Sequence, residues 1–231
     1  MLRKDPFAIG EYYHLYNRGT DRRTIFLDIH DYHRFIILLY LCNTDKAVNL
    51  ESQFRKGRSF TELFDLKRGA PLVSIGAWCL MPNHFHLLVK EIVPGGITKF
   101  MRKINTGYSM YFNKKQDRIG NLFQGRFKSE NLYTDEYLKY IFSYIHLNPI
   151  KLINGESEWK EIGIKDKVNA KNFLLKYEYS SLGSYLNENN LYQKIISKKD
   201  FPEYFPNKES VWGEILEWLS FNDVKDGPLQ T

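Results

Sequence analysis

Hydrophobic residues in the first seventy positions follow a strand-like spacing and then a helix-like one. Residues 12–16 form an apolar segment typical of a strand, and a polar turn extends from there to residue 23. From Asp28 onward, apolar side chains recur every three or four residues, which predicts a helix over about 29–43. Residues 44–70 are polar and charged, so we interpret them as an insertion that partly folds.

The middle of the chain predicts a hairpin, a helix and a further strand. Two apolar segments, 72–80 and 84–90, are separated by Met-Pro-Asn, a combination that favours a turn. Apolar positions at helical spacing then predict an amphipathic helix over 97–111. Residues 120–132 return to an extended pattern, which predicts another strand.

A last strongly patterned helix precedes Pro149. Thr134 is a good N-cap, and the two acids that follow it suit the positive end of a helix. The resulting order β-α-β-β-α-β-α predicts an α+β fold, with a ferredoxin-like split β-α-β core whose antiparallel sheet carries helices on one face. We expect a catalytic domain over residues 1–150, and a C-terminal extension over 151–231 packed on that core.

Composition and length narrow the class of protein. The chain has 231 residues, 43% of them hydrophobic, which is enough for a real core. Its longest purely apolar run, 35–42, is far below the ~20 residues that span a bilayer, and we see no signal-like N-terminus. We therefore expect a cytoplasmic protein without a membrane segment. The two cysteines, Cys42 and Cys79, resemble buried hydrophobes more than a disulfide or zinc site.

The formal charge of +6 is concentrated in one stretch, residues 97–128. This stretch contains eight basic residues and only one acidic residue, Asp117, and six Phe or Tyr residues lie among them. Basic side chains hold a nucleic-acid backbone, while aromatic rings stack on its bases, so this stretch favours a single-stranded nucleic acid as partner. The alternative is an ordinary solvated helix face with core aromatics. The basic residues are Lys99, Arg102, Lys103, Lys114, Lys115, Arg118, Arg126 and Lys128.

Two histidines in the second hairpin strand are candidate metal ligands. His84 and His86 stand at i and i+2, so both rings leave the same face of the strand. Two imidazoles leave the coordination of a divalent metal incomplete, and a further ligand is then needed. Buried, hydrogen-bonded histidines with no such role are commoner, and that alternative stays open on this tripeptide alone.

The helix before Pro149 supplies a candidate third ligand and a candidate nucleophile. Tyr140, Tyr144 and Asn148 are spaced by four and so share a face. The Asn148 oxygen suits Mg²⁺ or Mn²⁺ together with the two imidazoles, and Tyr144 would lie one turn away as the nucleophile. However, a helical tyrosine is usually core and an asparagine before proline is usually a cap, and spacing alone does not single out Tyr144 among sixteen tyrosines.

In combination, five motifs covering about residues 8–185 resemble the IS200-like single-tyrosine (Y1) transposases of the HUH superfamily, and in particular their REP-associated branch. The resemblance implies that His84 and His86 bind a metal with Asn148 as third ligand, and that Tyr144 forms a 5′-phosphotyrosine. The motifs are Tyr13-His-Leu-Tyr-Asn-Arg-Gly19, Met81-Pro-Asn-His-Phe-His-Leu-Leu88, Asn121-Leu-Phe-Gln-Gly-Arg-Phe-Lys128, Tyr144-Ile-His-Leu-Asn-Pro149 and Tyr179-Ser-Ser181.

The DNA contacts expected from the basic and motif residues involve Lys99, Arg102, Lys103, Arg126, Lys128, Arg18 and His14. A packed, hydrogen-bonded role for His14 is an equal alternative. We interpret His146, between the tyrosine and the asparagine, as a surface or DNA-contacting residue. Tyr108 and Tyr111 are rival nucleophiles by composition, but they lack an amide four residues on. Since the chain is longer than minimal members of the family, it can be a monomer or a homodimer.

The function expected from these motifs is a transposase-like, metal-dependent endonuclease and strand transferase. It would act on single-stranded DNA at hairpins. Two alternatives stay open: a domesticated DNA-binding regulator without activity, and an HUH nickase of the replication-initiator or relaxase kind. An RNA-binding ferredoxin-like module would want exposed aromatics where this chain has histidines.

Overall fold

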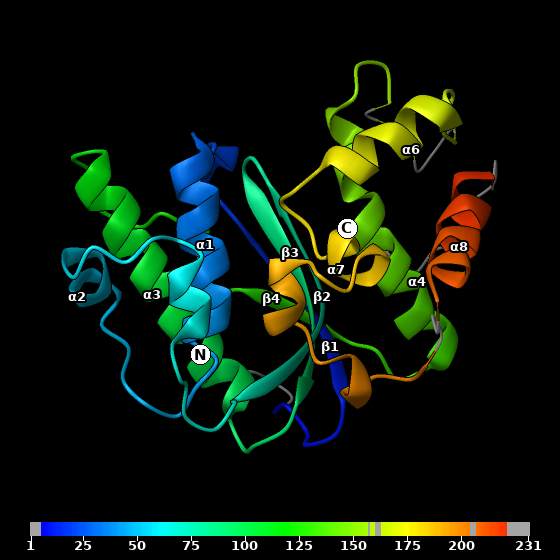
Figure 1. Ribbon diagram of the computed structural model, residues 1–231. Helices are drawn as coiled ribbons and strands as arrows, with labels where there is room; N and C mark the ends of the chain where they lie inside the picture. Colours follow the sequence, from blue (N-terminus) through cyan, green and yellow to red (C-terminus); the bar gives the residue numbers. More distant parts are fainter. Residues whose placement is uncertain (1–5, 157, 160–162, 204–206, 221–231) are drawn as a thin grey trace.

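A four-stranded antiparallel sheet organises the molecule, in the order β2-β3-β1-β4 (Figure 1). The computed structural model describes residues 6–156, 158–159, 163–203 and 207–220. Strand β3 lies between β1 and β2, which is the split β-α-β arrangement, and the predicted α+β fold is confirmed. The strands are β1 (Tyr12–Arg18), β2 (Val73–Met81), β3 (His84–Glu91) and β4 (Lys128–Asn131).

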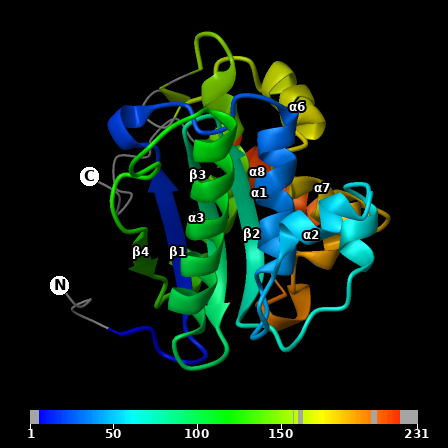
Figure 2. The same cartoon turned by 90° about the vertical axis from the view of Figure 1, so that its left-hand side faces the viewer.

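Helices α1 (Ile29–Leu41) and α3 (Gly96–Lys115) cover one face of the sheet, as predicted (Figure 2). Helix α4 (Asp135–Leu147), which carries the candidate tyrosine, packs on β2 and β3 from the other face. Thr134 caps α4 by accepting a hydrogen bond from the Tyr137 amide at 3.1 Å. The sheet therefore separates α4 from the basic helix α3.

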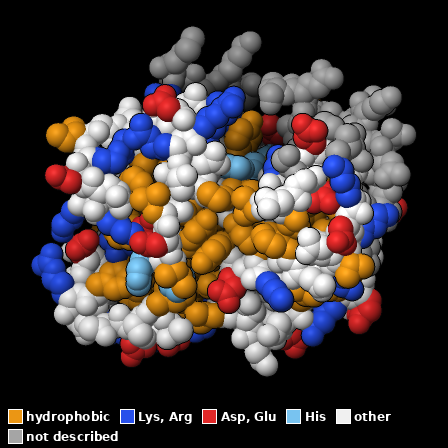
Figure 3. Space-filling model, turned by 90° about the horizontal axis from the view of Figure 1, so that it is seen from above, with side chains coloured by type: hydrophobic (Ala, Val, Ile, Leu, Met, Phe, Trp, Pro, Cys, Tyr) orange, Lys and Arg blue, Asp and Glu red, His pale blue; other side chains and the backbone are white. Residues whose placement is uncertain are grey.

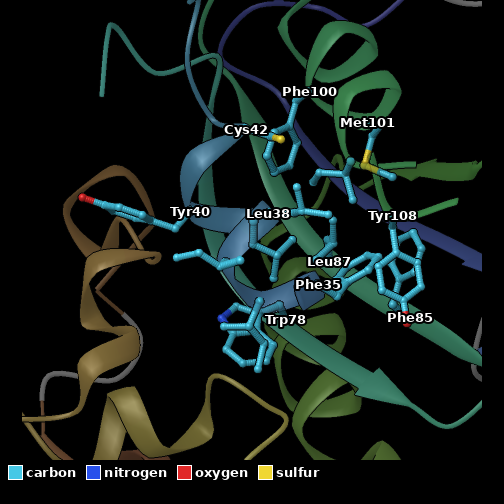
Figure 4. Packing of buried hydrophobic residues seen from close by; sticks show 14 of the residues in the cluster. Phe35, Leu38, Tyr40, Cys42, Trp78, Phe85, Leu87, Phe100, Met101 and Tyr108 are labelled. Atoms are coloured by element: carbon cyan, nitrogen blue, oxygen red, sulfur yellow. The ribbon is translucent and has the colours of Figure 1, made fainter. Parts of the chain in front are cut away.

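Each face of the sheet has its own hydrophobic core because strand side chains alternate between faces. Phe85 and Leu87 of β3 face α1 and α3, where they meet Phe35 and Tyr108 (Figure 4). Leu88 lies in the other core, which α4 completes. The even-numbered residues of β3, including both histidines, consequently point toward α4.

The predicted strand over 120–132 is wrong for its first half. Only β4, at the end of that segment, pairs with β1. Leu122 and Phe123 are buried from a loop, and the Thr20 amide donates to the Leu122 carbonyl at 2.9 Å. Both apolar side chains thus anchor the loop, and the Phe123 ring packs edge-on against Phe85 of β3.

The insertion and the C-terminal extension are made of short helices. The insertion contains α2 (Leu50–Arg55) and η2 (Glu62–Asp65), and η1 (Thr20–Arg22) follows β1. Beyond α4, the segment Tyr179–Ser181 runs along the edge of β2, where the Leu80 amide donates to the Tyr179 carbonyl at 2.9 Å. The remaining elements are η3 (Asn148–Leu152), α6 (Lys167–Lys176), α7 (Leu182–Leu186), η4 (Leu191–Lys194), η5 (Lys198–Asp200) and α8 (Lys208–Ser220).

None of the helices in the described part of the chain combines the length and the apolar character that crossing a bilayer requires.

Candidate active site

Strand register brings the two histidines to one end of the sheet. Arg18 pairs with His84 and Tyr16 pairs with His86 across β1 and β3. Because directly opposed residues on antiparallel strands share a face, the side chains of these four residues point to the same side. The ring centroids of His84 and His86 are 5.0 Å apart, and the rings are nearly perpendicular.

The neighbouring Asn83 orients the ring of His84. The Nδ1 atom of His84 lies 2.6 Å from the Asn83 Oδ1, which can only accept, so Nδ1 carries the proton. Burial, together with the positive charges of Lys151 and Arg18, lowers the pKa of His84 to about 4. At neutral pH, His84 is therefore an uncharged imidazole whose Nε2 lone pair is available to a metal.

Another histidine, His14 of β1, forms a hydrogen bond with the ring of His86. His14 Nε2 and His86 Nδ1 are 2.9 Å apart, and His14 Nδ1 lies 3.6 Å from a carboxylate oxygen of Glu130. His14 is 2% exposed, so the predicted contact of His14 with DNA does not fit its position. The packed, hydrogen-bonded alternative is the one that the structure shows.

Tyr144 projects from α4 onto this pair of rings. The centroid of its ring lies 5.4 Å from that of His86 and 5.9 Å from that of His14, in edge-to-face contacts. Tyr140, one turn earlier, stacks against it at 6.1 Å. Burial raises the pKa of Tyr144 above its usual value, and the Asn148 side chain offsets part of this effect. The phenol is thus protonated at neutral pH.

Asn148 caps the end of the tyrosine helix, one turn after Tyr144. It is fully buried, and its Nδ2 donates to the Tyr144 carbonyl at 3.0 Å. Its Oδ1 is also buried, yet it has no hydrogen-bond partner among the described residues. A buried amide oxygen without a hydrogen-bond donor destabilises the fold, and a cation bound to that oxygen would remove the cost.

In chemical type, the imidazoles of His84 and His86 and the amide oxygen of Asn148 are donors that divalent metals accept, although Asn148 does not line the cavity with the histidines. Within the described residues, no group of three His, Cys, Asp or Glu side chains is placed to hold a metal. The candidate set is instead two imidazoles and one amide oxygen, which leaves coordination positions for water and substrate. Mg²⁺ and Mn²⁺ both accept such nitrogen and oxygen donors when substrate oxygens complete the shell.

A cavity of about 450 Å³ opens over the histidines and the tyrosine. Arg18, Arg22 and Lys128 give its wall a positive charge. At this end of the sheet, hydrophobic side chains gather in the middle of the surface and most Lys and Arg side chains lie around them (Figure 3). The lining consists of Tyr16, Asn17, Arg18, Arg22, Asn83, His84, His86, Gln124, Lys128 and Tyr144.

The structure separates the predicted DNA-binding residues into two groups. Arg18 and Lys128 line the cavity, whereas Arg126 lines a neighbouring one beside the end of α3. Lys99, Arg102 and Lys103 lie on α3, across the sheet from Tyr144. The ammonium group of Lys103 donates to the carbonyls of Thr44 and Lys46 at 2.5 and 2.6 Å, so it fastens the start of the insertion.

Three other predicted residues can now be placed. Tyr108 is fully buried with its hydroxyl on the Ile25 carbonyl, and Tyr111 donates to Asp31 at 2.9 Å. Both are on the α1/α3 side of the sheet, away from the histidines. The interpretation of His146 as a surface or DNA-contacting residue is wrong, because it is fully buried and bonded to Ser181 at 2.8 Å.

Sequence reasoning missed Asn83, Gln124 and Glu130. The contact between Asn83 and His84 could have been predicted because the two residues are adjacent in sequence. However, the predicted turn already explained an asparagine at this position. Gln124 bonds the Arg18 guanidinium from a loop. Glu130 reaches His14 only through the pairing of β1 with β4, and that register is not written in any local pattern.

Comparison with known proteins supports the resemblance seen in the motifs. Residues 57–148 match the model of a family described as "Transposase IS200 like". A solved structure described as "Structure of the REP associates tyrosine transposase bound to a REP hairpin" is similar over 80% of this chain and 84% of that chain, with 14% identity and a TM-score of 0.47. No curated protein gives a significant match. The segment from 57 to 148, which holds both histidines, Tyr144 and Asn148, is thus similar to IS200-like transposases, as the motifs predicted.

Proposed function

We propose that this protein is a metal-dependent endonuclease and strand transferase for single-stranded DNA, acting at hairpins through a 5′-phosphotyrosine on Tyr144. One observation carries the proposal: Tyr144 lies against His86, in the same basic cavity as His84, with its ring centroid 5.4 Å from that of His86. Single-stranded DNA and its hairpins are what the resemblance to IS200-like transposases implies as substrate.

The chemistry follows from the phenol. The Tyr144 oxygen attacks the phosphorus of a phosphodiester, the bond to the 3′ oxygen breaks, and the phosphate stays on the tyrosine. The phenol gives up its proton, and the departing 3′ oxygen takes one up. Since the link stores the broken phosphodiester, another 3′ hydroxyl can attack it and release Tyr144, which is strand transfer.

His84, His86 and Asn148 are the residues that would hold Mg²⁺ or Mn²⁺. Such a cation would polarise the phosphodiester and stabilise the charge on its oxygens. Two observations support this role. Burial lowers the pKa of His84 and so keeps its imidazole uncharged, and the Asn148 Oδ1 has no hydrogen-bond donor among the described residues. Removal of the metal by EDTA should abolish cleavage.

Arg18, Arg22 and Lys128 would position the DNA backbone, because guanidinium and ammonium groups bind phosphate oxygens at a cavity wall. These side chains give affinity without reading bases. We place Lys99, Arg102 and Lys103 outside this primary contact, since α3 lies on the opposite face of the sheet. The activity belongs in the cytoplasm, where a DNA substrate is available.

A denaturing gel tests this function directly. Purified protein is incubated with 5′- or 3′-labelled hairpin oligonucleotides carrying single-stranded flanks, in Mn²⁺ or in EDTA. We expect a covalent adduct only with Mn²⁺, retaining the label 3′ to the cleaved bond. Tyr144→Phe should lose the adduct while its DNA binding stays within about twofold.

Tyr140→Phe is the matched control, since Tyr140 lies one turn earlier on the same helix and stacks on Tyr144. It should still form the adduct. An adduct of normal yield in Tyr144→Phe would exclude the proposed nucleophile, and full activity in EDTA would exclude the metal. Tight binding of several hairpins with no adduct would favour the DNA-binding regulator instead.

A further inference from the structure

A cavity of about 710 Å³ lies on the face of the sheet away from Tyr144, and the proposed function does not use it. Its walls come from α1, from residues 48–55 of the insertion and from α3 (Figure 1). We call it the insertion cavity. Five basic side chains and one acidic side chain line it, so its lining carries a net positive charge. A concave site of this volume is typical of those that hold a small organic ligand, and its charge favours an anion.

One of the five cations, Arg34 of α1, is built into the wall of the cavity. It is 9% exposed, whereas the other four are half-buried or exposed. Its guanidinium carbon lies 4.7 Å from the centroid of the Tyr111 ring and 5.2 Å from that of Phe54. These cation–π contacts hold the guanidinium plane in a fixed position. The hydrogen bond that Arg34 makes within the described residues runs from Nη2 to a carboxylate oxygen of Glu51, at 3.2 Å.

Glu51 compensates the charge of Arg34 only in part. The side chain of Glu51 is 51% exposed, so water screens its attraction for the guanidinium group. Burial lowers the pKa of Arg34, and the charge of Glu51 opposes this effect, but a guanidinium group stays protonated at neutral pH. A buried cation without full compensation is unfavourable, and an anion bound in the cavity would supply the missing charge.

The rim of the cavity indicates a multiply charged anion. Arg55 of α2 and Arg102 and Lys114 of α3 are exposed there, and none of the three forms an ion pair within the described part of the chain. One guanidinium group is enough to bind a carboxylate in bidentate fashion. Several cations around a buried arginine are better suited to the closely spaced charges of phosphate groups.

The wall of the same cavity is apolar. Leu38, Val48, Leu50 and Met110 line it, and the Met110 side chain is 69% exposed. A ligand that covers these side chains would remove apolar surface from water. A molecule with phosphate at one end and a flat, largely apolar ring system at the other would match both the rim and the wall. This combination is the chemistry of a nucleotide.

We propose that the insertion cavity is a nucleotide-binding site separate from the catalytic cavity, in which Arg34 and the rim cations hold the phosphates and the apolar wall contacts the base. A free nucleotide and an unpaired nucleotide of a DNA strand present the same chemistry to it. The site uses neither Tyr144 nor the histidines, so it goes beyond the proposed function and does not depend on it. It gives a role to the insertion, and to Arg102 across the sheet from Tyr144.

Calorimetric titration of the full chain with dATP in EDTA tests the site without metal or cleavage. Inorganic tripolyphosphate, which has the charges but no base, should bind at least about tenfold more weakly than dATP, because it gains nothing from the apolar wall. This comparison uses the wild type alone, so no variant has to fold. Equal affinities for the two compounds would overturn the assignment of a nucleotide.

Variants locate the bound nucleotide. Arg102→Gln, an exposed change at the rim, should weaken dATP binding about three- to tenfold, and Arg34→Lys, which keeps the charge but loses the planar fork, about tenfold or more. Arg58→Gln is the matched control, since Arg58 is an exposed basic residue of the same insertion outside the cavity lining. It should bind dATP as the wild type does.

A five-nucleotide strand of deoxyadenylate distinguishes the two sources of the nucleotide. Binding of dATP that depends on Arg102 supports a site for a free nucleotide, and binding of the strand alone with the same dependence supports a site for DNA. The proposal is overturned if the wild type binds neither, or if Arg102→Gln binds them as tightly as Arg58→Gln. It is also overturned if Lys128→Gln is the variant that loses affinity, because the nucleotide would then lie in the catalytic cavity. None of these results involves the Tyr144 adduct, so failure here leaves the proposed function standing.

Discussion

His84 and His86 are two residues apart on one strand, yet they are fixed in different ways. Asn83, the preceding residue, holds His84, whereas His14 holds His86 from 72 positions away. Local spacing was enough to predict that both rings share a face. It did not reveal the partner of His86, because that partner depends on how β1 pairs with β3.

The position of His146 also could not be predicted from local spacing. Its sequence neighbours Tyr144 and Asn148 suggested a role in DNA contact, but a position two residues away on a helix faces elsewhere. The ring is enclosed between α4 and the segment around Ser181, to which it is bonded at 2.8 Å. Only the fold of the C-terminal extension, which has no strong pattern of its own, determines this burial.

The buried His146 should make the protein sensitive to acid. Burial lowers its pKa to about 3 in the folded state, while the unfolded chain retains the usual value of about 6.5. Between these values the unfolded state binds more protons, so the free energy of unfolding decreases as the pH falls, by up to about 1.4 kcal/mol per pH unit. Urea titrations from pH 7 to 4 should show a shallower dependence for His146→Gln than for the wild type. Equal slopes would contradict the assignment.

At the level of elements, side-chain contacts hold α4 near both of its ends. Tyr137 near its beginning donates to Glu130 of β4, and His146 near its end bonds to Ser181. Ser181 in turn is fixed to β2, since its hydroxyl accepts from the Trp78 amide at 2.9 Å. The helix that presents Tyr144 is therefore fastened at two points to the sheet that carries the histidines.

Removing the second fastening should destabilise the fold. Ser181→Ala leaves a buried imidazole nitrogen and the buried Trp78 amide without this partner, which costs about 1–3 kcal/mol. Urea denaturation measures the loss, and Ser109→Ala, a half-buried serine on α3, is the control, expected to stay within about 0.5 kcal/mol. A Ser181→Ala protein as stable as this control would show that the contact contributes little.

Periodicity predicted the long elements well because their buried faces are continuous. Helices α1, α3 and α4 begin within two residues of the expected positions, at Ile29, Gly96 and Asp135. The pattern misled over 120–127, where buried Leu122 and Phe123 resemble strand residues but anchor a loop. Alternation reports burial, and it does not distinguish a strand from a loop that packs its side chains into the core.

For the whole molecule, one chain contains every part of the candidate site. Helix α4 packs on β2 and β3 of its own chain, so Tyr144 meets the histidines without a second copy. We therefore expect each chain to be active by itself, whether the protein is a monomer or a homodimer. Catalysis should not require exchange of tyrosine helices between subunits.

Mixing two inactive variants tests this prediction. A Tyr144→Phe chain has intact histidines, and a His84→Ala chain has an intact tyrosine. If each site is built within one chain, the mixture should form no adduct after co-incubation or co-refolding. An exchanged dimer would instead restore up to about half of the sites in co-refolded heterodimers. Restored adduct formation would therefore contradict a site completed by one chain.

Identification of the residue that carries the DNA is the most direct test of the account. The adduct is trimmed with nuclease and digested with trypsin, and the peptide spanning residues 140–151 is sequenced by fragment-ion mass spectrometry. This peptide contains both Tyr140 and Tyr144, so the measurement distinguishes the nucleophile from its stacked neighbour. The account predicts a nucleotide phosphate on Tyr144 alone. A nucleotide on Tyr140, or on a tyrosine outside this peptide, would contradict it.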